Sequence, residues 1–455
     1  MTISQAIHYD LFVMGAGPGG YAAAILGAKK GLHVGIAEGV HLGGTCTNTG
    51  CIPAKAYIES INLYGQIKIA QRLGIETQTP RLTLDALNKR KTRIVKRLVK
   101  GIEYLLKKNS VDIYPGFAEI LGKNTIKVNN KSIWFTSLII ATGSQPKRPT
   151  MFDLPGIWTS EDIFDVTEMP SSLLVVGGGA IGMELAHIFT NLGVEVTVIE
   201  ALERILPFED EDVSRELTSM YRKIRFITSA RIHEIDTSSG FKLRIEYPGG
   251  KEIISGQCLL LCIGREPHIP LGVKELGISI APSGGLHVDS FLQTNIPGIY
   301  AIGDVTGQYM YAHVATKEAE VAVDHITGGS KGMDYSAVPS IVFTNPEIAS
   351  VGKRLDEIDP SSMRKGTFPV SALGRARTME VSEGFAHIYC TPGGKIERVT
   401  IMAPHATELI SWATLAISQG LVLEEFLKPI CPHPTLSELL KEASEDVLGL
   451  SIHKP

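Results

Sequence analysis

The stretch Leu11-Phe12-Val13-Met14-Gly15-Ala16-Gly17-Pro18-Gly19-Gly20 decides the fold of the first part of this chain. A short apolar run leads into a Gly-x-Gly-x-x-Gly turn, an Ala-rich helix follows, and a second apolar run ends at Glu38. In such a turn Gly15 permits the tight bend, Gly17 lets the backbone approach a pyrophosphate, and Gly20 lets helix and strand pack closely. We therefore predict a strand–helix–strand unit that binds a dinucleotide, with Glu38 accepting hydrogen bonds from a ribose.

The same arrangement recurs in the middle of the chain. The run 173–176 leads into a second glycine turn, and the strand after its helix ends at Glu200. In both copies the acid stands eighteen positions after the last motif glycine. Two such units predict two bound dinucleotides, and Glu200 would repel a 2′-phosphate, which favours NAD over NADP. We interpret Arg204, which could soften that preference, as a solvated surface residue. The motif glycines of this second turn are Gly177, Gly179 and Gly182.

Two further apolar runs end in glycine and close the two units. The run 138–142 ends at Gly143, and the run 259–263 ends at Gly264. Between them, residues 147–155 are polar and rich in proline, which predicts a crossing between domains.

The segment 43–55 carries two cysteines, Cys46 and Cys51, among glycines and a proline. Residues five apart on a regular helix lie about 140° apart around its axis, so a bridge needs the distorted backbone that Asn48 and Gly50 tolerate. A structural staple closing so short a loop would contribute only about 2 kcal/mol. We therefore interpret the pair as a redox-active disulfide, with the staple as the alternative.

Bulk composition describes an ordinary globular chain of 455 residues, long enough for about two to four domains. A net charge of −4 predicts no nucleic-acid partner. The remaining cysteines stand far apart or in apolar runs, which predicts no metal site and a reducing compartment. The first motif begins too early to leave room for a signal or transit peptide, and no apolar run reaches membrane length. We therefore expect a cytoplasmic protein without membrane contact.

Taken together, these motifs resemble those of the flavin-dependent pyridine nucleotide–disulfide oxidoreductases, and within them the lipoamide branch. The resemblance covers nearly the whole chain. It rests on the cysteine motif, both glycine turns, the segment 298–304 and the sequence His-Pro-Thr-Leu-Ser-Glu at 433–438. It implies an α/β fold with two Rossmann-like domains, for FAD and NAD, a small central domain and a C-terminal α/β dimerisation domain. The boundaries we expect are 1–147 for FAD and the disulfide, 148–270 for NAD, 271–339 for the central domain and 340–455 for dimerisation.

The resemblance also assigns roles to the redox residues. Cys46 would be the interchange thiol that meets the substrate disulfide, and Cys51 the thiolate beside the flavin. Lys55 would lie near the flavin ring, paired with Glu184, and Asp304 would bind the flavin ribityl chain.

At the C-terminus, the resemblance makes His433 the general acid and base, with Glu438 orienting its imidazole. His433 would reach the cysteines across a homodimer interface. The implied activity is oxidation of dihydrolipoyl groups on a carrier, such as a 2-oxoacid dehydrogenase complex acyltransferase or glycine cleavage H protein, with hydride passed to NAD. An NADH-dependent reductase of another small disulfide and a non-catalytic redox-sensing flavoprotein remain alternatives. The chain departs from the usual family residues at Thr47, Thr49, Ala54 and Cys431.

A basic segment lies outside these motifs. Seven Lys and Arg residues fall between Lys89 and Lys100, and apolar residues recur every three or four positions, which predicts an amphipathic helix. The apolar positions are Ile94, Leu98, Ile102 and Leu105. The basic face would either dock an acidic lipoyl-carrying protein or remain a solvated surface.

Overall fold

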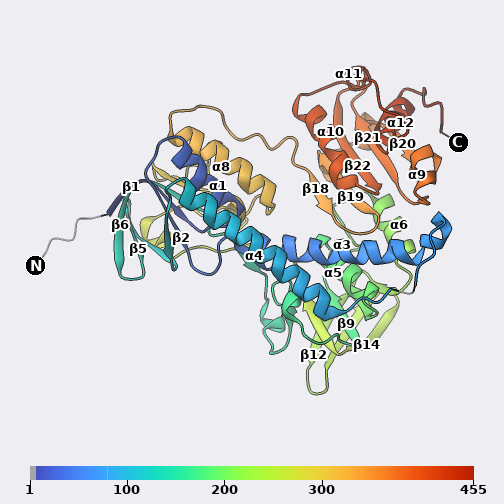
Figure 1. Ribbon diagram of the computed structural model, residues 1–455, viewed down its shortest axis with the longest axis horizontal. Coiled ribbons are helices and arrows are strands. Elements are labelled where there is room, and N and C mark those ends of the chain that lie inside the picture. Colours follow the sequence, from blue (N-terminus) through green and yellow to red (C-terminus); the bar gives the residue numbers. More distant parts are fainter. Residues whose placement is uncertain (1–6, 79, 455) are drawn as a thin grey trace, which may run out of the picture.

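The computed structural model describes residues 7–78 and 80–454 (Figure 1). The expectation that no signal or transit peptide precedes the first motif rests on residues 1–6, which lie outside the described residues. Among the described residues, no helix is both long and apolar enough to cross a membrane.

The first unit is built on a sheet whose parallel strands run in the order β3-β2-β1-β6, with β17 also parallel to β6. β1 (Ile7–Met14) lies at its centre, and the glycine turn joins the carboxyl end of β1 to α1 (Pro18–Lys29). The other strands are β2 (Val34–Glu38), β3 (Asp112–Pro115), β4 (Ala118–Gly122), β5 (Thr125–Val128), β6 (Lys131–Ile140) and β17 (Ile299–Ala301). This sheet confirms the first predicted strand–helix–strand unit.

The segment after residue 271 returns to this first unit. β17 extends its sheet, and α8 (Ala312–Ile326) packs beside α1 (Figure 1). Val273 at the start of α7 (Val273–Leu276) and Val323 near the end of α8 belong to the same hydrophobic cluster as β1. The expected boundaries at 147, 270 and 339 stay predictions.

The second unit has a parallel sheet in the order β11-β10-β9-β15-β8. Its glycine turn joins β9 (Ser172–Val176) to α5 (Ala180–Asn191), which repeats the geometry of the first unit. The other elements are β8 (Trp158–Thr159), β10 (Glu195–Ile199), α6 (Glu211–Met220), β11 (Ile224–Ile227) and β15 (Cys258–Leu261), with an antiparallel sheet β12 (Arg231–Asp236), β13 (Phe241–Tyr247) and β14 (Gly250–Gly256). Together the two parallel sheets confirm the predicted α/β fold.

The crossing between the two units is a short antiparallel ribbon. β7 (Ser144–Pro146) pairs with β16 (Arg265–Pro267), so the chain leaves and re-enters the first unit side by side. Both strands begin directly after the closing glycines Gly143 and Gly264, as the two apolar runs predicted.

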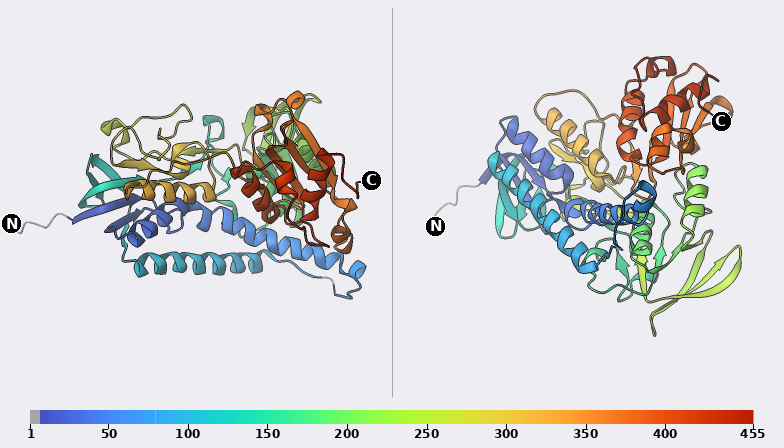
Figure 2. Two further views of the ribbon diagram at one scale, coloured as in Figure 1. Left: turned by 90° about the horizontal axis from the view of Figure 1, so that it is seen from above. Right: turned by 45° about the vertical axis from the view of Figure 1, so that its right-hand side comes forward.

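Two long helices cover the front of the molecule (Figures 1 and 2). The short α2 (Gly44–Asn48) is followed by α3 (Cys51–Lys68), and α4 (Leu84–Lys108) packs along α3. α4 confirms the predicted helix, but its buried residues are Leu87, Lys91, Ile102 and Leu106. The expected apolar stripe is therefore partly wrong, because Leu98 and Leu105 are exposed where α3 does not cover them.

The C-terminal part is a five-stranded antiparallel sheet covered by helices. Its order is β18-β19-β22-β21-β20, and α10 and α12 pack on it (Figure 1). The elements are β18 (Ser340–Val342), β19 (Glu347–Gly352), β20 (Arg364–Pro369), α9 (Gly374–Thr378), β21 (Phe385–Cys390), β22 (Ile396–Ala403), α10 (Ala406–Ser418), α11 (Leu423–Phe426) and α12 (Glu438–Val447).

Candidate active site

A large cavity of about 2350 Å³ runs between the two glycine turns and past the cysteine pair. It brings together most of the residues that the sequence analysis selected, although they come from segments far apart in the chain. Gly182, His433 and Glu438 do not line it. The selected residues that do are Gly15, Gly17, Gly20, Glu38, Cys46, Cys51, Lys55, Gly143, Gly177, Gly179, Glu184, Glu200, Gly264 and Asp304.

The two glycine turns have matching shapes that fit phosphate groups. A Cβ on Gly20 would lie 1.9 Å from the Gly15 carbonyl oxygen, and one on Gly182 would lie 2.0 Å from the Gly177 oxygen. These glycines therefore permit helix and turn to touch. By contrast, a Cβ on Gly17 or Gly179 would meet nothing within 4 Å, so the backbone there faces open space. Each turn thus presents the N-terminus of a helix, with its unpaired N–H groups, to the cavity.

The acid after each unit is tied to its own glycine turn. Glu38 accepts hydrogen bonds from the backbone N–H groups of Ala16 (2.7 Å) and Val40 (2.9 Å). Glu200 accepts from Gly178 (2.6 Å) and Leu202 (2.8 Å) in the same pattern. Both carboxylates are therefore fixed at the edge of the cavity, where the sequence predicts ribose binding.

Arg204 differs from the expectation of a solvated surface residue. Its guanidinium donates to the backbone carbonyls of Pro207 (2.9 Å) and Glu209 (3.1 Å). Arg204 is half-buried, and its guanidinium holds the loop that follows Glu200.

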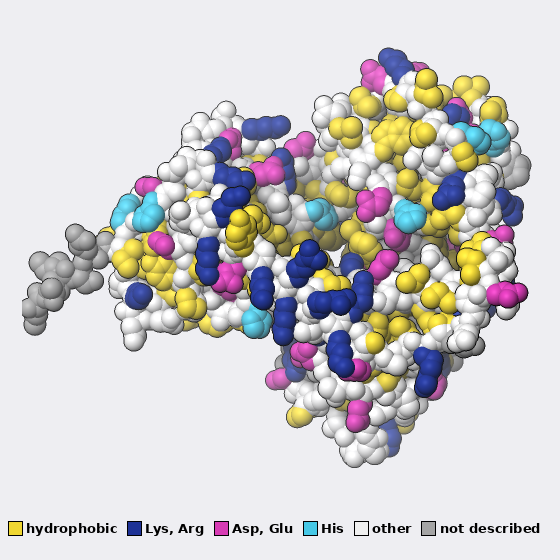
Figure 3. Space-filling model, in the orientation of Figure 1, with side chains coloured by type: hydrophobic (Ala, Val, Ile, Leu, Met, Phe, Trp, Pro, Cys, Tyr) yellow, Lys and Arg dark blue, Asp and Glu magenta, His cyan; other side chains and the backbone are white. Residues whose placement is uncertain are grey.

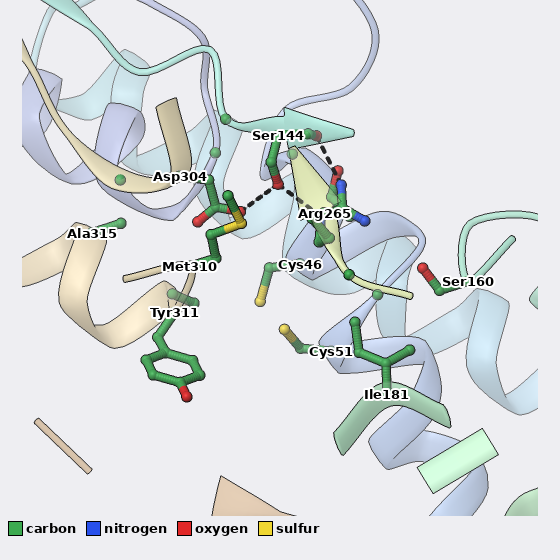
Figure 4. A pocket seen from close by; sticks show the side chains of 18 of the residues that line it. Cys46, Cys51, Ser144, Ser160, Ile181, Arg265, Asp304, Met310, Tyr311 and Ala315 are labelled. Carbon is green, nitrogen blue, oxygen red and sulfur yellow. Dashed lines mark hydrogen bonds between the residues drawn. The ribbon is translucent and has the colours of Figure 1, made fainter. Parts of the chain in front are cut away.

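The cysteine pair lies at the break between two helices. α2 ends at Asn48, and α3 begins at Cys51 after the irregular residue Gly50. This break lets Cys46 and Cys51 turn their sulfurs into one space, opposite Tyr311 (Figure 4). Both are thiols here, and Cys51 is exposed to the cavity while Cys46 is half-buried.

The pKa values of the two thiols are shifted in opposite directions. The hydrogen bond with Cys46 lowers the pKa of Cys51, and the Lys55 ammonium acts in the same direction against burial. The same hydrogen bond, together with burial, raises the pKa of Cys46. Because the thiolate is the reactive form of cysteine, the reduced pair concentrates its negative charge on Cys51.

A buried carboxylate joins the cysteine helix to two other parts of the chain. Glu184, on α5, accepts from the Lys55 ammonium at 2.8 Å and from the backbone N–H of Phe343 at 3.0 Å. Lys55 also lies over the Phe343 ring, 4.5 Å from its centroid. The expected Lys55–Glu184 pair is therefore present, and Phe343 is a neighbour that the sequence analysis missed.

A second missed group converges on Asp304 (Figure 4). Ser144 donates to Asp304 at 2.6 Å, and Arg265 donates to Ser144 and, at 2.8 Å, to Glu161. Burial raises the pKa of Asp304 although the Ser144 hydrogen bond opposes it. These residues follow the closing glycines of the two units, so their position directly after Gly143 and Gly264 was the available signal.

Glu318 is the third missed residue, and it is fully buried. It accepts a hydrogen bond from the Gly303 N–H at 2.5 Å and one from the Tyr335 hydroxyl at 2.6 Å. Gly303 precedes Asp304 in the turn that lines the cavity. Burial raises the pKa of Glu318 to about 7, so this carboxyl holds the turn and titrates near neutrality.

We predict that Glu318→Gln removes part of the pH dependence of the free energy of unfolding. Because the folded pKa (about 7) exceeds the ordinary 4.5, the folded protein binds more protons than the unfolded chain between these values. Its stability therefore falls as pH rises through this window, by up to about 3 kcal/mol. Urea unfolding of wild type and variant at pH 5 and pH 8 measures this difference. The exposed neighbour variant Glu320→Gln should behave as wild type, and parallel pH profiles for Glu318→Gln would contradict the prediction.

His433 and Glu438 lie together but outside the cavity. Their side chains approach at 2.8 Å between His433 Nδ1 and Glu438 Oε1, and the Thr435 N–H holds the second carboxylate oxygen at 2.9 Å. The His433 side chain is 73% exposed. Within one chain, therefore, the imidazole lies outside the cavity that holds the cysteines, and its Nε2 has no hydrogen-bond partner among the described residues.

The departures from the usual family residues divide between two places. Thr49 and Ala54 line the cavity, whereas Thr47 is buried beneath the turn at Gly43. Cys431 is half-buried beside His433, and burial raises the pKa of its thiol.

Within residues 7–78 and 80–454, no group of three or more His, Cys, Asp or Glu side chains is arranged to hold a metal ion.

Fold, glycine turns and cysteine pair define a dinucleotide-dependent disulfide oxidoreductase, and comparison with known families agrees. Residues 9–319 match the family model of pyridine nucleotide-disulphide oxidoreductases, and residues 338–444 match the dimerisation domain of that family. The chain belongs to this family. It is therefore an enzyme whose cofactors are FAD and NAD, and its dimerisation domain indicates a homodimer.

Individual relatives match over nearly their full length. Dihydrolipoyl dehydrogenase of Chlamydia pneumoniae is 36% identical and that of Bacillus subtilis 36% identical, with at least 98% of every chain covered. The enzyme of Thermus scotoductus is 38% identical over 98% of both chains. Among solved structures, LpdA from Mycobacterium tuberculosis has a TM-score of 0.88 at 27% identity, covering 97% of this chain and 99% of that one. The HOCl-induced flavoprotein disulfide reductase RclA from Escherichia coli has a TM-score of 0.84 at 26% identity, covering 96% and 99%.

Proposed function

We propose that this protein is a dihydrolipoyl dehydrogenase, which oxidises a dihydrolipoyl dithiol to its disulfide and reduces NAD to NADH with release of a proton. The observation that carries the choice of substrate is the full-length similarity to dihydrolipoyl dehydrogenases of three bacteria. The paired cysteines beside two dinucleotide turns in one cavity support the chemistry.

The reaction begins at the oxidised Cys46–Cys51 bridge. A dihydrolipoyl thiolate attacks the Cys46 sulfur, forming a mixed disulfide and releasing Cys51 as a thiolate. The second dihydrolipoyl thiolate then attacks the lipoyl sulfur of the mixed disulfide, which closes the lipoyl ring and leaves Cys46 reduced. The lowered pKa of Cys51 supports this order, because a more acidic thiol is the better leaving group.

His433 is the proposed acid and base for these steps. Glu438 accepts from Nδ1, so Nε2 is the free basic atom and takes the proton of the attacking thiol. The imidazole is exposed and does not line the cavity of its own chain, which supports action across the homodimer. The partner subunit's His433 would therefore serve the cysteines of the first.

The two glycine turns that line the cavity support a site for each cofactor. We propose that FAD is held at the first turn, with Asp304 at its ribityl chain, and that NAD is held at the second turn. The proposed FAD residues are Gly15, Gly17, Gly20, Glu38, Gly143, Lys55 and Asp304. The proposed NAD residues are Gly177, Gly179, Gly182, Glu184, Glu200 and Gly264. Bound there, FAD would supply the two-electron chemistry that connects the reduced cysteine pair to NAD. The chain supplies orientation, the Cys51 charge and the open turns for the phosphates.

An anaerobic titration with free dihydrolipoamide tests the proposal. Reduction of the purified holoenzyme, followed by NADH formation when NAD is added, would support both the cysteine relay and the substrate. A visible spectrum that responds to NADH but not to dihydrolipoamide would contradict the substrate.

The second candidate is an NADH-dependent reductase of another small disulfide. The structural similarity to the disulfide reductase RclA favours it as the alternative. Steady-state rates with lipoamide, glutathione disulfide and coenzyme A disulfide separate the two, because the proposed enzyme should prefer lipoamide. A non-catalytic redox sensor is disfavoured by the intact cysteines, the Lys55–Glu184 pair and the His433–Glu438 pair.

The choice of NAD predicts the effect of Glu200→Gln. Removing the carboxylate charge removes its repulsion of a 2′-phosphate, so the ratio of kcat/KM for NADP to that for NAD should rise about tenfold, which corresponds to ~1.4 kcal/mol. Glu195→Gln, an equal charge change at the exposed start of β10, is the control. An unchanged ratio in Glu200→Gln would contradict this role.

The partner and compartment follow from the same proposal. The dihydrolipoyl group would be attached to a carrier protein, such as a 2-oxoacid dehydrogenase complex acyltransferase or glycine cleavage H protein. We propose a reducing compartment, the cytoplasm, because six cysteines in 455 residues are too few for a secreted disulfide scaffold, and the four outside the pair have no disulfide partner among the described residues.

A further inference from the structure

The outer face of α4 carries a concentrated positive charge. Between Lys89 and Lys100 the sequence holds seven Lys and Arg residues and no Asp or Glu, although the whole chain has a net charge of −4. Figure 3 shows a group of dark blue Lys and Arg side chains near the centre of the face, where α4 lies in Figure 1. This contrast makes α4 a local attractor for negative groups on an otherwise acidic protein.

Two of the seven basic residues turn inward and fix the helix. Arg90 donates to the Ala56 carbonyl on α3, and the buried Lys91 ammonium donates to the Phe164 carbonyl at 2.7 Å. Tyr57 on α3 also bonds Asn88 at 2.5 Å. These contacts hold α4 rigidly against α3 and the second unit, so the remaining basic side chains project from a fixed surface.

The outward residues form what we call the α4 basic face: Lys89, Arg93, Lys96, Arg97 and Lys100. Lys89 pairs with Asp85 at 2.7 Å. The other four are exposed, and none has an ion-pair partner in the part of the chain that the structure describes. Because residues three and four apart on a helix are neighbours, these like charges repel one another and would be relieved by carboxylates from outside.

An exposed aromatic side chain continues the same face. Tyr104 stands one turn beyond Lys100 and is 62% exposed. Tyrosine and arginine are the residues that most often anchor protein interfaces. A face that combines both favours the folded surface of a protein over an extended polyanion, because an exposed aromatic side chain offers apolar contact area as well as charge.

We propose that the α4 basic face and Tyr104 dock an acidic lipoyl-carrying domain that presents the dihydrolipoyl group to the enzyme. The proposal rests on the proposed function and adds the surface that recognises the carrier. α4 packs along α3, whose first residue is Cys51, so a docked domain lies against the helix pair that carries the redox cysteine. An acidic domain would otherwise be repelled by a chain of net charge −4.

The test compares two substrates over a range of salt concentrations. Wild-type holoenzyme is assayed with free dihydrolipoamide and with an acidic domain bearing the dihydrolipoyl group. With the domain, kcat/KM should fall as salt rises, because salt screens the attraction. At low salt, the variant Arg93→Glu/Lys96→Glu/Arg97→Glu should lose at least about tenfold in kcat/KM for the domain. Adding salt should then raise the kcat/KM of this variant, because salt screens the new repulsion. Its kcat/KM for free dihydrolipoamide should stay unchanged.

A matched variant separates the effect of the α4 basic face from the effect of the net charge. Lys123→Glu/Lys223→Glu/Lys331→Glu alters three exposed lysines elsewhere and gives the same net charge, −10, as the α4 variant. It should keep the falling salt dependence. Equal losses in both variants would overturn the docking surface, and so would loss of the dimer in sedimentation of the α4 variant, which would make the face a contact between copies. A wild-type enzyme inactive toward free dihydrolipoamide would instead refute the proposed function, and the docking proposal with it.

Discussion

Replacing Cys46 with serine is expected to abolish oxidation of dihydrolipoamide while FAD stays bound. A serine hydroxyl cannot form the disulfide that accepts electrons from the substrate, and the third cysteine that lines the cavity, Cys262, packs against the second glycine turn. Turnover should fall to the background of the assay, a larger effect than any other single change proposed here. Stopped-flow reduction by dihydrolipoamide, with the visible flavin spectrum of the purified variant, measures both parts of the expectation.

The matching control is Cys258→Ser. Cys258 begins β15, is half-buried and does not line the cavity. This variant should keep full turnover. Reduction by NADH should also survive in Cys46→Ser, because the nicotinamide side of the cavity is built from the second glycine turn and not from the cysteine pair. Unchanged dihydrolipoamide turnover in Cys46→Ser would remove the central hypothesis.

The second large effect is expected for His433→Gln, which should lower kcat for dihydrolipoamide by about 10²–10⁴, the usual contribution of general acid and base catalysis. Glutamine keeps a hydrogen-bonding side chain but cannot carry a proton between thiols. Steady-state rates between pH 6 and pH 9 provide this measurement.

Glu438→Gln distinguishes catalysis from positioning. Its amide keeps a carbonyl acceptor for His433 Nδ1, now 2.8 Å from the carboxylate, but removes the charge that stabilises the imidazolium. We therefore expect a smaller loss of kcat than in His433→Gln. If His433→Gln costs less than about tenfold, His433 is not the general base. Mixing inactive Cys46→Ser subunits with His433→Gln subunits tests action across the dimer, because hybrid dimers should regain one complete site.

Much of the fold could be predicted because its decisive signals are local. Each glycine turn with its strands and terminal acid lies within about thirty residues, and the backbone approach of Gly20 to Gly15 follows from the motif itself. The hydrogen bonds from Glu38 and Glu200 to their own turns are equally short in sequence. The family resemblance added the order of domains and the pairing of Lys55 with Glu184.

The rest of the site was not predictable, because it joins residues that only packing brings together. Asp304 meets Ser144 across 160 positions, and Glu184 meets Phe343 across 159. No periodicity or spacing encodes such contacts. Sequence also could not tell that Lys91, one of seven similar cations, would be buried against the Phe164 carbonyl.

The sequence by itself determined the two nucleotide units, the cysteine pair and the general architecture, since short-range backbone geometry dictates those features. Only the tertiary structure decided which thiol is the more acidic, that burial raises the pKa of Glu318 to about 7 and that His433 lies outside the cavity of its own cysteines. The physical reason is that acidity and orientation depend on burial, hydrogen bonds and nearby charges, which exist only once distant segments have packed.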